Sequence, residues 1–210
     1  MADELVFYTN PMSRGRIIRW MLEEVGRPYR TEVLQYGTTM KAPDYLAINP
    51  MGKVPAIKHG DTVVTEGAAI CAYLADAFPH VGLAPPHGSK ERGAYYRWLF
   101  FAAGCVEPAV TNKSLGFEAP PEKRSTIGYG SMADVLSGLE MALSKGPYIT
   151  GENFSAADVY VGSQIGWGTR FGTLENRPAF GPYLQRIFAR PAAIRANEID
   201  DKLIAEAQQQ

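Results

Sequence analysis

The chain has 210 residues, of which 46% are hydrophobic and 20% charged, and its formal net charge is −1. These values exclude a disordered or fibrous chain and are typical of a globular protein with a sizeable core. A nearly neutral chain has no electrostatic reason to bind nucleic acid or an anionic membrane surface, so neither is expected as a partner.

The start of the chain and its cysteines predict a cytoplasmic protein. Asp3 and Glu4 are acidic where a secretory signal is basic. No apolar run approaches the roughly 20 residues that span a bilayer. Cys71 and Cys105 are far apart and lack a C-x-x-C or metal-ligand spacing, so no metal site is expected.

The first part of the chain alternates between strand-like and helix-like stretches. Residues 5–8 form a short apolar run typical of a buried strand. Residues 17–25 carry apolar side chains at helical spacing and are followed by Gly26, a typical helix end. Residues 29–34 alternate like a second strand, and the strand–helix–strand order predicts a parallel pair. The other side of the helix, expected to face solvent, carries Arg16, Arg19, Glu23 and Glu24.

A hairpin and a helix are predicted next. Residues 54–58 and 62–65 flank the turn signal Gly60-Asp61. A helix then begins at about Glu66 and stops before Pro79. With a short helical or irregular connection before the hairpin, the predicted order is β-α-β-α-β-β-α.

The predicted domain boundary is a Pro/Gly-rich stretch over residues 79–87. We expect an α/β domain at 1–80, a linker at 81–88 and an all-helical domain at 89–210. Pro108 is expected to end or kink the first helix of that second domain. The helices are predicted at residues 95–107, 131–143, 156–167, 178–189 and 191–206.

Three segments of the first domain have patterns that suit either structure or ligand binding. Ser13 stands where the first helix begins and suits an N-cap. Pro55 stands at a strand start, where it either enters an edge strand or forms a cis bond that presents the backbone to a ligand. Glu66 opens a helix, whose free N–H groups attract a carboxylate, or it simply serves the helix dipole.

A fourth segment, Ser155-Ala156-Ala157-Asp158, has the spacing of a capping box. In this pattern the serine caps the helix start and the aspartate bonds back to the serine. We therefore predict a role in folding rather than in catalysis.

These segments, in this order and spacing, resemble those of the cytosolic glutathione transferases. Asn49-Pro50-Met51-Gly52-Lys53-Val54-Pro55 is similar to the family pattern N-P-x-G-x-V-P, and Ser155 to Asp158 is similar to the box that opens the family's sixth helix. The resemblance covers nearly the whole chain and identifies it as a bacterial-type, serine-type member. It implies a thioredoxin-like glutathione-binding domain, an all-α domain that shapes the second substrate's pocket, and a homodimer that acts in detoxification.

The resemblance also implies which residues hold glutathione. The backbone of Val54 pairs with the ligand like an added strand, Pro55 supplies the cis bond, and Lys53 approaches a carboxylate. Glu66 and Gly67 hold the γ-glutamyl end. The family has serine where this chain has Gly67, which removes one hydrogen bond worth about 1 kcal/mol.

The residue that activates the thiol is left open between three side chains. In serine-type members a hydroxyl donates a hydrogen bond to the glutathione thiolate and so lowers the thiol pKa. Ser13 ranks first for this role. Asn10 occupies the slot of the tyrosine used by other members and ranks second, and Tyr8 falls about two positions too early and ranks third.

Phe101 and Cys105 are assigned to the electrophile pocket, because they lie one helical turn apart and either side chain can face it. The alternative for these two residues is the core of the helical domain.

The predicted activity is thiol transfer from glutathione, a co-substrate, to an apolar electrophile, without a metal. One alternative is a glutathione-dependent disulfide reductase or peroxidase on the same fold, which a cysteine in place of Ser13 would favour. The other is a non-catalytic binding or regulatory protein that has kept the fold and lost turnover.

Overall fold

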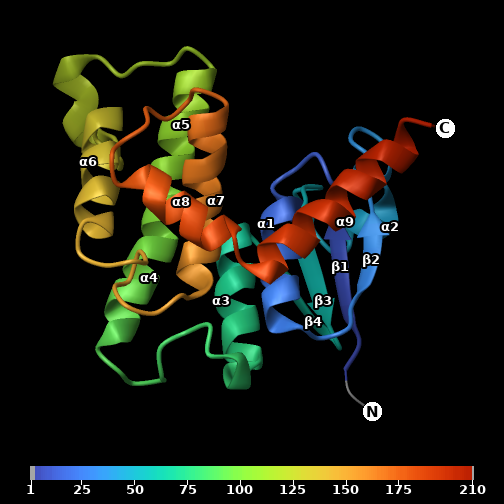
Figure 1. Ribbon diagram of the computed structural model, residues 1–210. Helices are drawn as coiled ribbons and strands as arrows, with labels where there is room; N and C mark the ends of the chain where they lie inside the picture. Colours follow the sequence, from blue (N-terminus) through green and yellow to red (C-terminus); the bar gives the residue numbers. More distant parts are fainter. Residues whose placement is uncertain (1–2, 210) are drawn as a thin grey trace. The chain divides into compact units, whose positions relative to one another are not determined.

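The computed structural model describes residues 3–209, which form two compact units (Figure 1). The first unit comprises the chain up to Val81 and again from Arg190, and the helical unit is Gly82–Ala189. The chain leaves the first unit within the predicted linker. The predicted assignment of residues 89–210 to one helical domain differs from this division, because the last helix packs within the first unit.

The first unit has the predicted order of elements and a mixed sheet of four strands. The strand order is β2-β1-β3-β4, with β1 and β2 parallel and the other neighbours antiparallel. The fold class predicted from the sequence, a thioredoxin-like domain followed by helices, is confirmed. The elements are β1 (Leu5–Thr9), α1 (Gly15–Val25), β2 (Arg30–Val33), η1 (Thr39–Lys41), α2 (Pro43–Leu46), β3 (Ala56–His59), β4 (Thr62–Thr65), α3 (Gly67–Ala77), η2 (Pro79–Val81) and α9 (Pro191–Ala207).

The pleat of the central strands divides the core between the two sheet faces. Phe7 pairs with Ile57, and both are fully buried on the face where Arg19 of α1 lies over the Phe7 ring. Tyr8 pairs with Ala56, and both pack on the opposite face in a cluster that includes Tyr45 of α2. Successive strand residues thus serve opposite faces.

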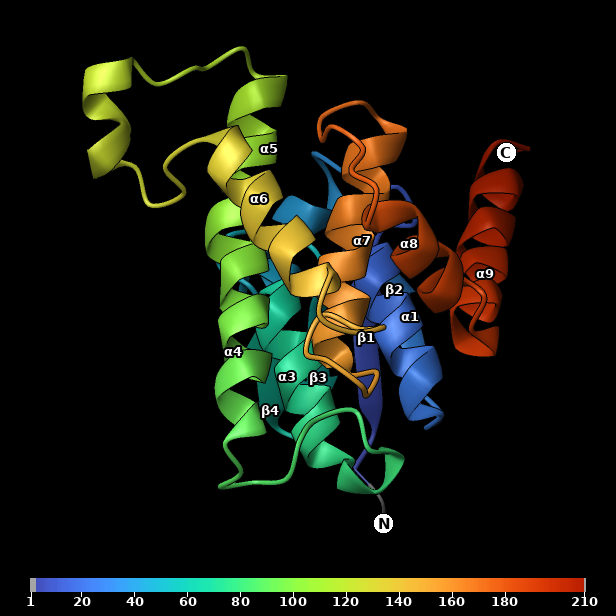
Figure 2. The same ribbon diagram turned by 60° about the vertical axis from the view of Figure 1, so that its left-hand side comes forward.

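The last helix, α9, lies beside α1 (Figures 1 and 2). The helix macrodipole favours acids near the start of a helix and bases near its end. In α1 and α9 the order is reversed, with arginines toward the start and acids toward the end. Pairing between the helices, rather than helix propensity, accounts for this pattern. The pairs are Arg16–Asp201 at 2.7 Å, Arg19–Asp200 at 3.2 Å, Glu23–Arg195 at 3.2 Å and Glu24–Arg190 at 2.7 Å.

The expectation that Arg19 faces solvent was wrong, since its side chain is only 2% exposed. Its Nε donates to Asp200, and its Nη1 donates to Tyr29 at 3.1 Å and to Thr31 at 2.8 Å. A buried guanidinium needs such partners to offset its lost hydration. Arg19 therefore belongs to the core between α1 and α9.

The helical unit contains one long helix that Pro108 does not end. It runs through α4 (Glu91–Phe101), a π-helical turn (Ala102–Val106) and α5 (Glu107–Ser114). Pro108 lacks the N–H that an α-helix needs, and the wider turn just before it shifts the hydrogen-bond pattern so that the helix continues. The remaining longer helices are α6 (Met132–Leu143), α7 (Ala156–Arg170) and α8 (Phe180–Phe188). No helix within residues 3–209 combines the length and the apolar character needed to cross a membrane.

The predicted capping box at the start of α7 is confirmed and lies in the interior of the helical unit. Asp158 is fully buried and accepts hydrogen bonds from the N–H groups of Ser155 at 2.9 Å and Ile149 at 2.8 Å. The Tyr183 hydroxyl donates to the same carboxylate at 3.1 Å. Burial raises the pKa of Asp158 to about 6, although these bonds act in the opposite direction.

Candidate functional site

The strand registers bring three segments together at one end of the sheet. Tyr8 near the end of β1 pairs with Ala56 at the start of β3, which in turn pairs with Thr65 at the end of β4. The loop into α1 follows β1, the Val54-Pro55 bond precedes β3, and Glu66 follows β4. The three segments singled out from the sequence therefore meet at this end of the first unit.

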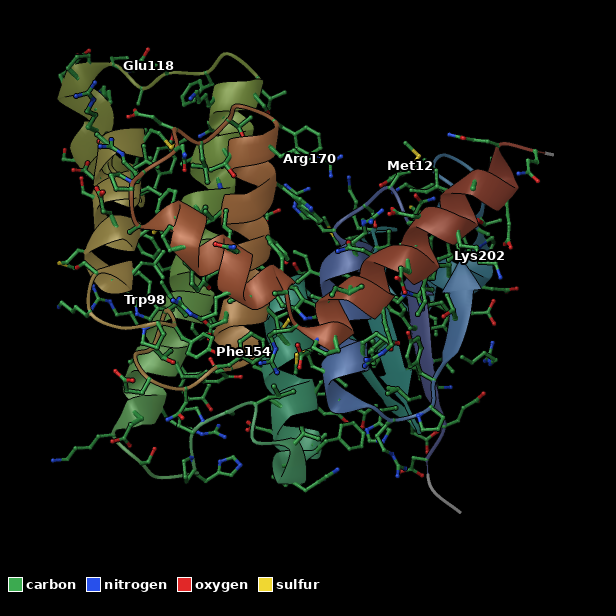
Figure 3. All side chains as sticks on the ribbon, in the orientation of Figure 1. Met12, Trp98, Glu118, Phe154, Arg170 and Lys202 are labelled. Carbon is green, nitrogen blue, oxygen red and sulfur yellow. The ribbon has the colours of Figure 1, made fainter. Side chains whose placement is uncertain are left out.

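Asn10 holds the loop between β1 and α1. Its side chain is buried, its Nδ2 donates to the carbonyl of Leu34 at 2.8 Å, and its Oδ1 accepts from the N–H of Met12 at 2.9 Å. Met12 itself projects from the molecule (Figure 3) and is 75% exposed. The nitrogen and the oxygen of the Asn10 side-chain amide thus both hold the loop in place.

Ser13 is partly exposed and lies just before α1. Its hydroxyl donates to the carbonyl of Asn10 at 2.7 Å and accepts from the N–H of Gly15 at 2.9 Å. The N–H of Ser13 also donates to the Asn10 carbonyl, at 3.0 Å. The N-cap of α1 is Arg14, so the expectation that Ser13 is the N-cap was wrong, and the Ser13 hydroxyl instead holds the turn that leads into the helix.

Gly15 lets the chain pass close to Thr9. A Cβ at position 15 would lie 2.0 Å from the Thr9 Oγ1 and 3.0 Å from the Ser13 Oγ. We expect Gly15→Ala to lower the free energy of unfolding by about 2 kcal/mol, because the added methyl overfills this site. Urea denaturation followed by circular dichroism measures this loss in the free energy of unfolding.

A second substitution tests the cause of that loss. The Thr9 Oγ1 is buried and makes no hydrogen bond to the described residues, so Thr9→Ala removes the obstructing atom without breaking a hydrogen bond. Adding it to Gly15→Ala should restore at least half of the lost stability. If the double variant is no more stable than Gly15→Ala, the close contact with Thr9 is not the cause.

Tyr8 lies in the packing cluster on the α2 face of the sheet. Its ring is 5.5 Å from that of Tyr45, centroid to centroid, and Met40 belongs to the same cluster. Its contacts are thus those of a core side chain.

The Val54-Pro55 peptide bond is cis, one of the two conformations considered for this position. The residue before this bond, Lys53, is held in place by two side chains. The carbonyl of Lys53 accepts hydrogen bonds from the Tyr45 hydroxyl at 2.5 Å and from the Asn49 Nδ2 at 2.9 Å. Asn49 is part of the motif quoted above, whereas no local signal marks Tyr45.

Gly52 and Lys41 fix the start of the same segment. Gly52 has φ of 56°, a conformation that favours glycine, and a Cβ there would lie 2.7 Å from the Met40 carbonyl oxygen. The Lys41 Nζ donates to the carbonyl of Met51 at 3.0 Å. The backbone leading to Val54 is therefore held by contacts on both sides.

Glu66 has an unusual backbone conformation. Its φ of 64° is the one positive value among the non-glycine residues of 3–209, and it caps α3 while its side chain is exposed. Such strain in a folded protein costs about 1–3 kcal/mol and is concentrated at functional sites. The adjoining Gly67 is the first residue of α3.

The strain at Glu66 predicts different outcomes for two substitutions. We expect Glu66→Gly to be more stable than Glu66→Ala by about 1 kcal/mol, because only glycine adopts this φ freely. Thermal unfolding of both variants measures the difference. Equal stabilities would mean that the backbone at residue 66 is not strained.

The protein's own thiols are poorly suited to sulfur chemistry. Burial raises the pKa of both, and Cys71 is fully buried in α3. Cys105 lies in the π-helical turn with its Sγ 3.8 Å from the Gly128 carbonyl. Both shifts disfavour the thiolate form of these two cysteines.

Phe101 and Cys105 contact other residues of the helical unit. The ring of Phe101 lies edge-on to Trp98 at 5.3 Å, and Gly138 of α6 leaves room for it. These contacts suit packing of the helices; a place for the two side chains in an electrophile pocket stays a prediction.

Known proteins are similar to this chain in both sequence and fold. Residues 12–77 match the family model described as glutathione S-transferase, N-terminal domain. Glutathione S-transferase GstA of Escherichia coli O157:H7 is 32% identical over 165 residues, which cover 78% of this chain and 78% of that protein. Disulfide-bond oxidoreductase YfcG of Escherichia coli (strain K12) is 29% identical over 204 residues, covering 90% of this chain and 92% of the relative.

Solved structures agree with these relatives. A glutathione transferase from Methylococcus capsulatus str. Bath superposes with a TM-score of 0.77 at 31% identity, covering 94% of this chain and 98% of that one. A sphingomonad glutathione S-transferase complexed with glutathione gives a TM-score of 0.76 at 28% identity, covering 93% and 98%. The chain therefore belongs to the glutathione S-transferase family.

Proposed function

We propose that the protein is a serine-type glutathione transferase that binds glutathione as its thiolate and directs the sulfur to an electrophilic carbon of an apolar acceptor. The observation that supports this most strongly is the meeting of the Ser13 loop, the cis Val54-Pro55 bond and Glu66 at one end of the sheet. A cytoplasmic role in detoxification follows as part of the proposal.

The glutathione backbone would pair with Val54 as an added strand. The hydrogen bonds to the carbonyl of Lys53 hold this segment, so little backbone motion is needed on binding. The exposed Lys53 side chain would meet a ligand carboxylate. Glu66 would pair with the α-amino group of the ligand, and the N–H of Gly67 at the start of α3 would bond to its γ-glutamyl carboxylate.

Ser13 would activate the thiol by turning its hydroxyl from the Asn10 carbonyl to the ligand sulfur. The carbonyl keeps one hydrogen bond when this happens, because the N–H of Ser13 also donates to it. The hydroxyl therefore leaves without orphaning a buried acceptor. A donor to the sulfur favours the thiolate and lowers its pKa. Asn10 is less suited, since both ends of its amide are already engaged.

The acceptor would be an apolar molecule with an electrophilic carbon. The sulfur forms a bond to that carbon as the leaving group departs with the electron pair, or as a conjugated double bond takes up the pair. Holding the thiolate and acceptor together supplies the rest of the catalysis. Phe101 and Cys105 remain the residues proposed to contact the acceptor.

The pKa of bound glutathione in Ser13→Ala tests the proposal. We expect both proteins to bind glutathione, and only the wild type to lower the thiol pKa, as read from thiolate ultraviolet absorbance against pH. Ser13→Thr is the matched control, because it keeps the hydroxyl and should keep most of the shift. If Ser13→Ala retains the shift, another residue activates the thiol. If the wild type does not bind glutathione, the protein is not a transferase.

Disulfide reduction is a second candidate activity, because the relative YfcG is named a disulfide-bond oxidoreductase. The same thiolate would then attack sulfur rather than carbon, giving a mixed disulfide and releasing a thiol. A second glutathione would release the other thiol and leave oxidised glutathione. Mass spectrometry of the products separates the two activities, because only transfer yields a glutathione thioether.

We also propose that the protein is a homodimer. Tyr96 and Phe100 lie on one face of α4, four residues apart, and are 38% and 72% exposed. Exposed aromatic side chains on one helix face suit an interface between copies. Light scattering should give twice the mass of one chain, and the mass of a single chain would contradict the proposal.

A further inference from the structure

The helical unit contains a cavity that the proposed transferase activity does not use. It measures about 340 Å³ and lies between the end of α5, the start of α6 and the loop over residues 115–131 that joins them. This volume is within the range of small-molecule sites. The loop contains one short 3₁₀ helix, η4 (Pro121–Thr126). Figure 3 shows Glu118 on this loop.

The walls of the cavity are mainly apolar and aromatic. Ala109 and Met132 come from the two helices, and Phe117 and Tyr129 come from the loop. The Tyr129 hydroxyl accepts a hydrogen bond from Asn112 of α5 at 2.9 Å, which holds this aromatic wall in place. Phe117 is 53% exposed although it lines a cavity. An aromatic ring in this space would cover exposed apolar surface.

Two cations line the same cavity. Lys113 is exposed and makes no ion pair with an acid of residues 3–209. Arg124 lies 4.0 Å from Glu118, the outer limit of an ion pair, and the Glu118 side chain is 90% exposed. Two cations and one acid among the lining residues leave an excess of one positive charge. A ligand with a carboxylate suits this charge, and a carboxylate accepts hydrogen bonds from lysine and arginine.

We propose that this cavity binds a small aromatic carboxylate, with its ring against Phe117 and Tyr129 and its carboxylate at Lys113 and Arg124. All the residues that line this cavity belong to the helical unit, whereas the residues proposed to bind glutathione belong to the first unit. The cavity would give the protein a second ligand class beside glutathione and the electrophile.

Methionine-methyl NMR provides a signal specific to this cavity. The chain has seven methionines, and Met132→Leu identifies the signal of the methionine that lines the cavity. We expect titration with 2-naphthoate to shift the Met132 methyl signal and to saturate with a Kd of roughly 1 mM or tighter. The uncharged 2-naphthamide should bind about tenfold more weakly. Saturating glutathione should leave the 2-naphthoate titration unchanged.

Variants test the charge recognition. Lys113→Met with Arg124→Met should weaken 2-naphthoate binding about tenfold and leave 2-naphthamide binding unchanged. Both side chains are exposed, so the fold should be kept, and circular dichroism checks this. Lys145→Met, another exposed lysine of the helical unit, is the matched control and should bind like the wild type. A Met132 signal that does not move, equal affinities for the acid and the amide, or unchanged binding by the double variant would overturn the proposal.

Discussion

Replacing Asp158 by alanine should lower the free energy of unfolding by about 3 kcal/mol at pH 7. The N–H groups of Ile149 and Ser155 and the hydroxyl of Tyr183 all donate to this buried carboxylate. Each buried donor left without a partner costs about 1–3 kcal/mol, and removing a buried carboxylate offsets part of that loss. Chemical denaturation followed by circular dichroism measures the difference.

The capping box at the start of α6 provides the control. There Asp134 accepts from the backbone of Ser131 at 3.0 Å in the same arrangement, but its side chain is exposed. Asp134→Ala should therefore cost only about 1 kcal/mol, because water replaces the lost bonds. Equal losses for the two variants would show that burial does not set the contribution of Asp158.

The same carboxylate predicts a pH dependence. Its folded-state pKa of about 6 lies above the ordinary 3.8, so between these values the native state binds more protons than the unfolded state. The resulting stabilisation is complete below pH 3.8 and is lost as the pH rises through about 6. Relative to Asp158→Asn, which does not titrate, the wild type should gain up to about 3 kcal/mol between pH 7 and pH 4. A difference that shrinks on acidification would mean that the pKa of Asp158 is lowered instead.

Replacing Arg19 by methionine should lower the free energy of unfolding by about 3–5 kcal/mol. Methionine keeps the apolar stem over the ring of Phe7 but leaves the buried Asp200 without its ion-pair partner. Burial already raises the pKa of Asp200, although Arg19 acts to lower it. Urea denaturation at pH 7 measures the loss.

Two further variants test whether the buried pair is the cause. Asp200→Leu combined with Arg19→Met replaces both charges by apolar groups and should recover about 2 kcal/mol of the loss. Arg195→Met breaks the pair with Glu23, in which the arginine side chain is 52% exposed, and should cost less than about 1 kcal/mol. If the double variant is as unstable as Arg19→Met, the unpaired Asp200 does not explain the effect.

Local patterns were enough to predict most elements of the fold. The hairpin around Gly60 and the end of α1 at Gly26 follow from glycines that adopt positive φ, 56° and 69° in the structure. The buried cap at Asp158 follows from its three-residue spacing to Ser155. In each case the residues that interact are close together in the sequence.

Long-range contacts account for what the sequence did not predict. Asp200, the ion-pair partner of the buried Arg19, is 181 residues away from it in the sequence. The amphipathic pattern of α1 alone therefore predicted that Arg19 is exposed. The packing of α9 on α1 was not predicted for the same reason, because the two helices are far apart in the sequence. At the site, the strained backbone of Glu66 and the bond from the Tyr45 hydroxyl to Lys53 depend on tertiary packing. Periodicity and motif spacing carry no signal for either feature.

The place of α9 in the first unit has a consequence for how the protein is made. The ribosome must synthesise the 108 residues of the helical unit, 82–189, after finishing the earlier segment of the first unit and before reaching α9. At about 5–20 residues per second this takes roughly 5–20 s. Throughout that time the nascent chain carries Arg19 without Asp200, so the first unit cannot reach its full stability before α9 has been synthesised.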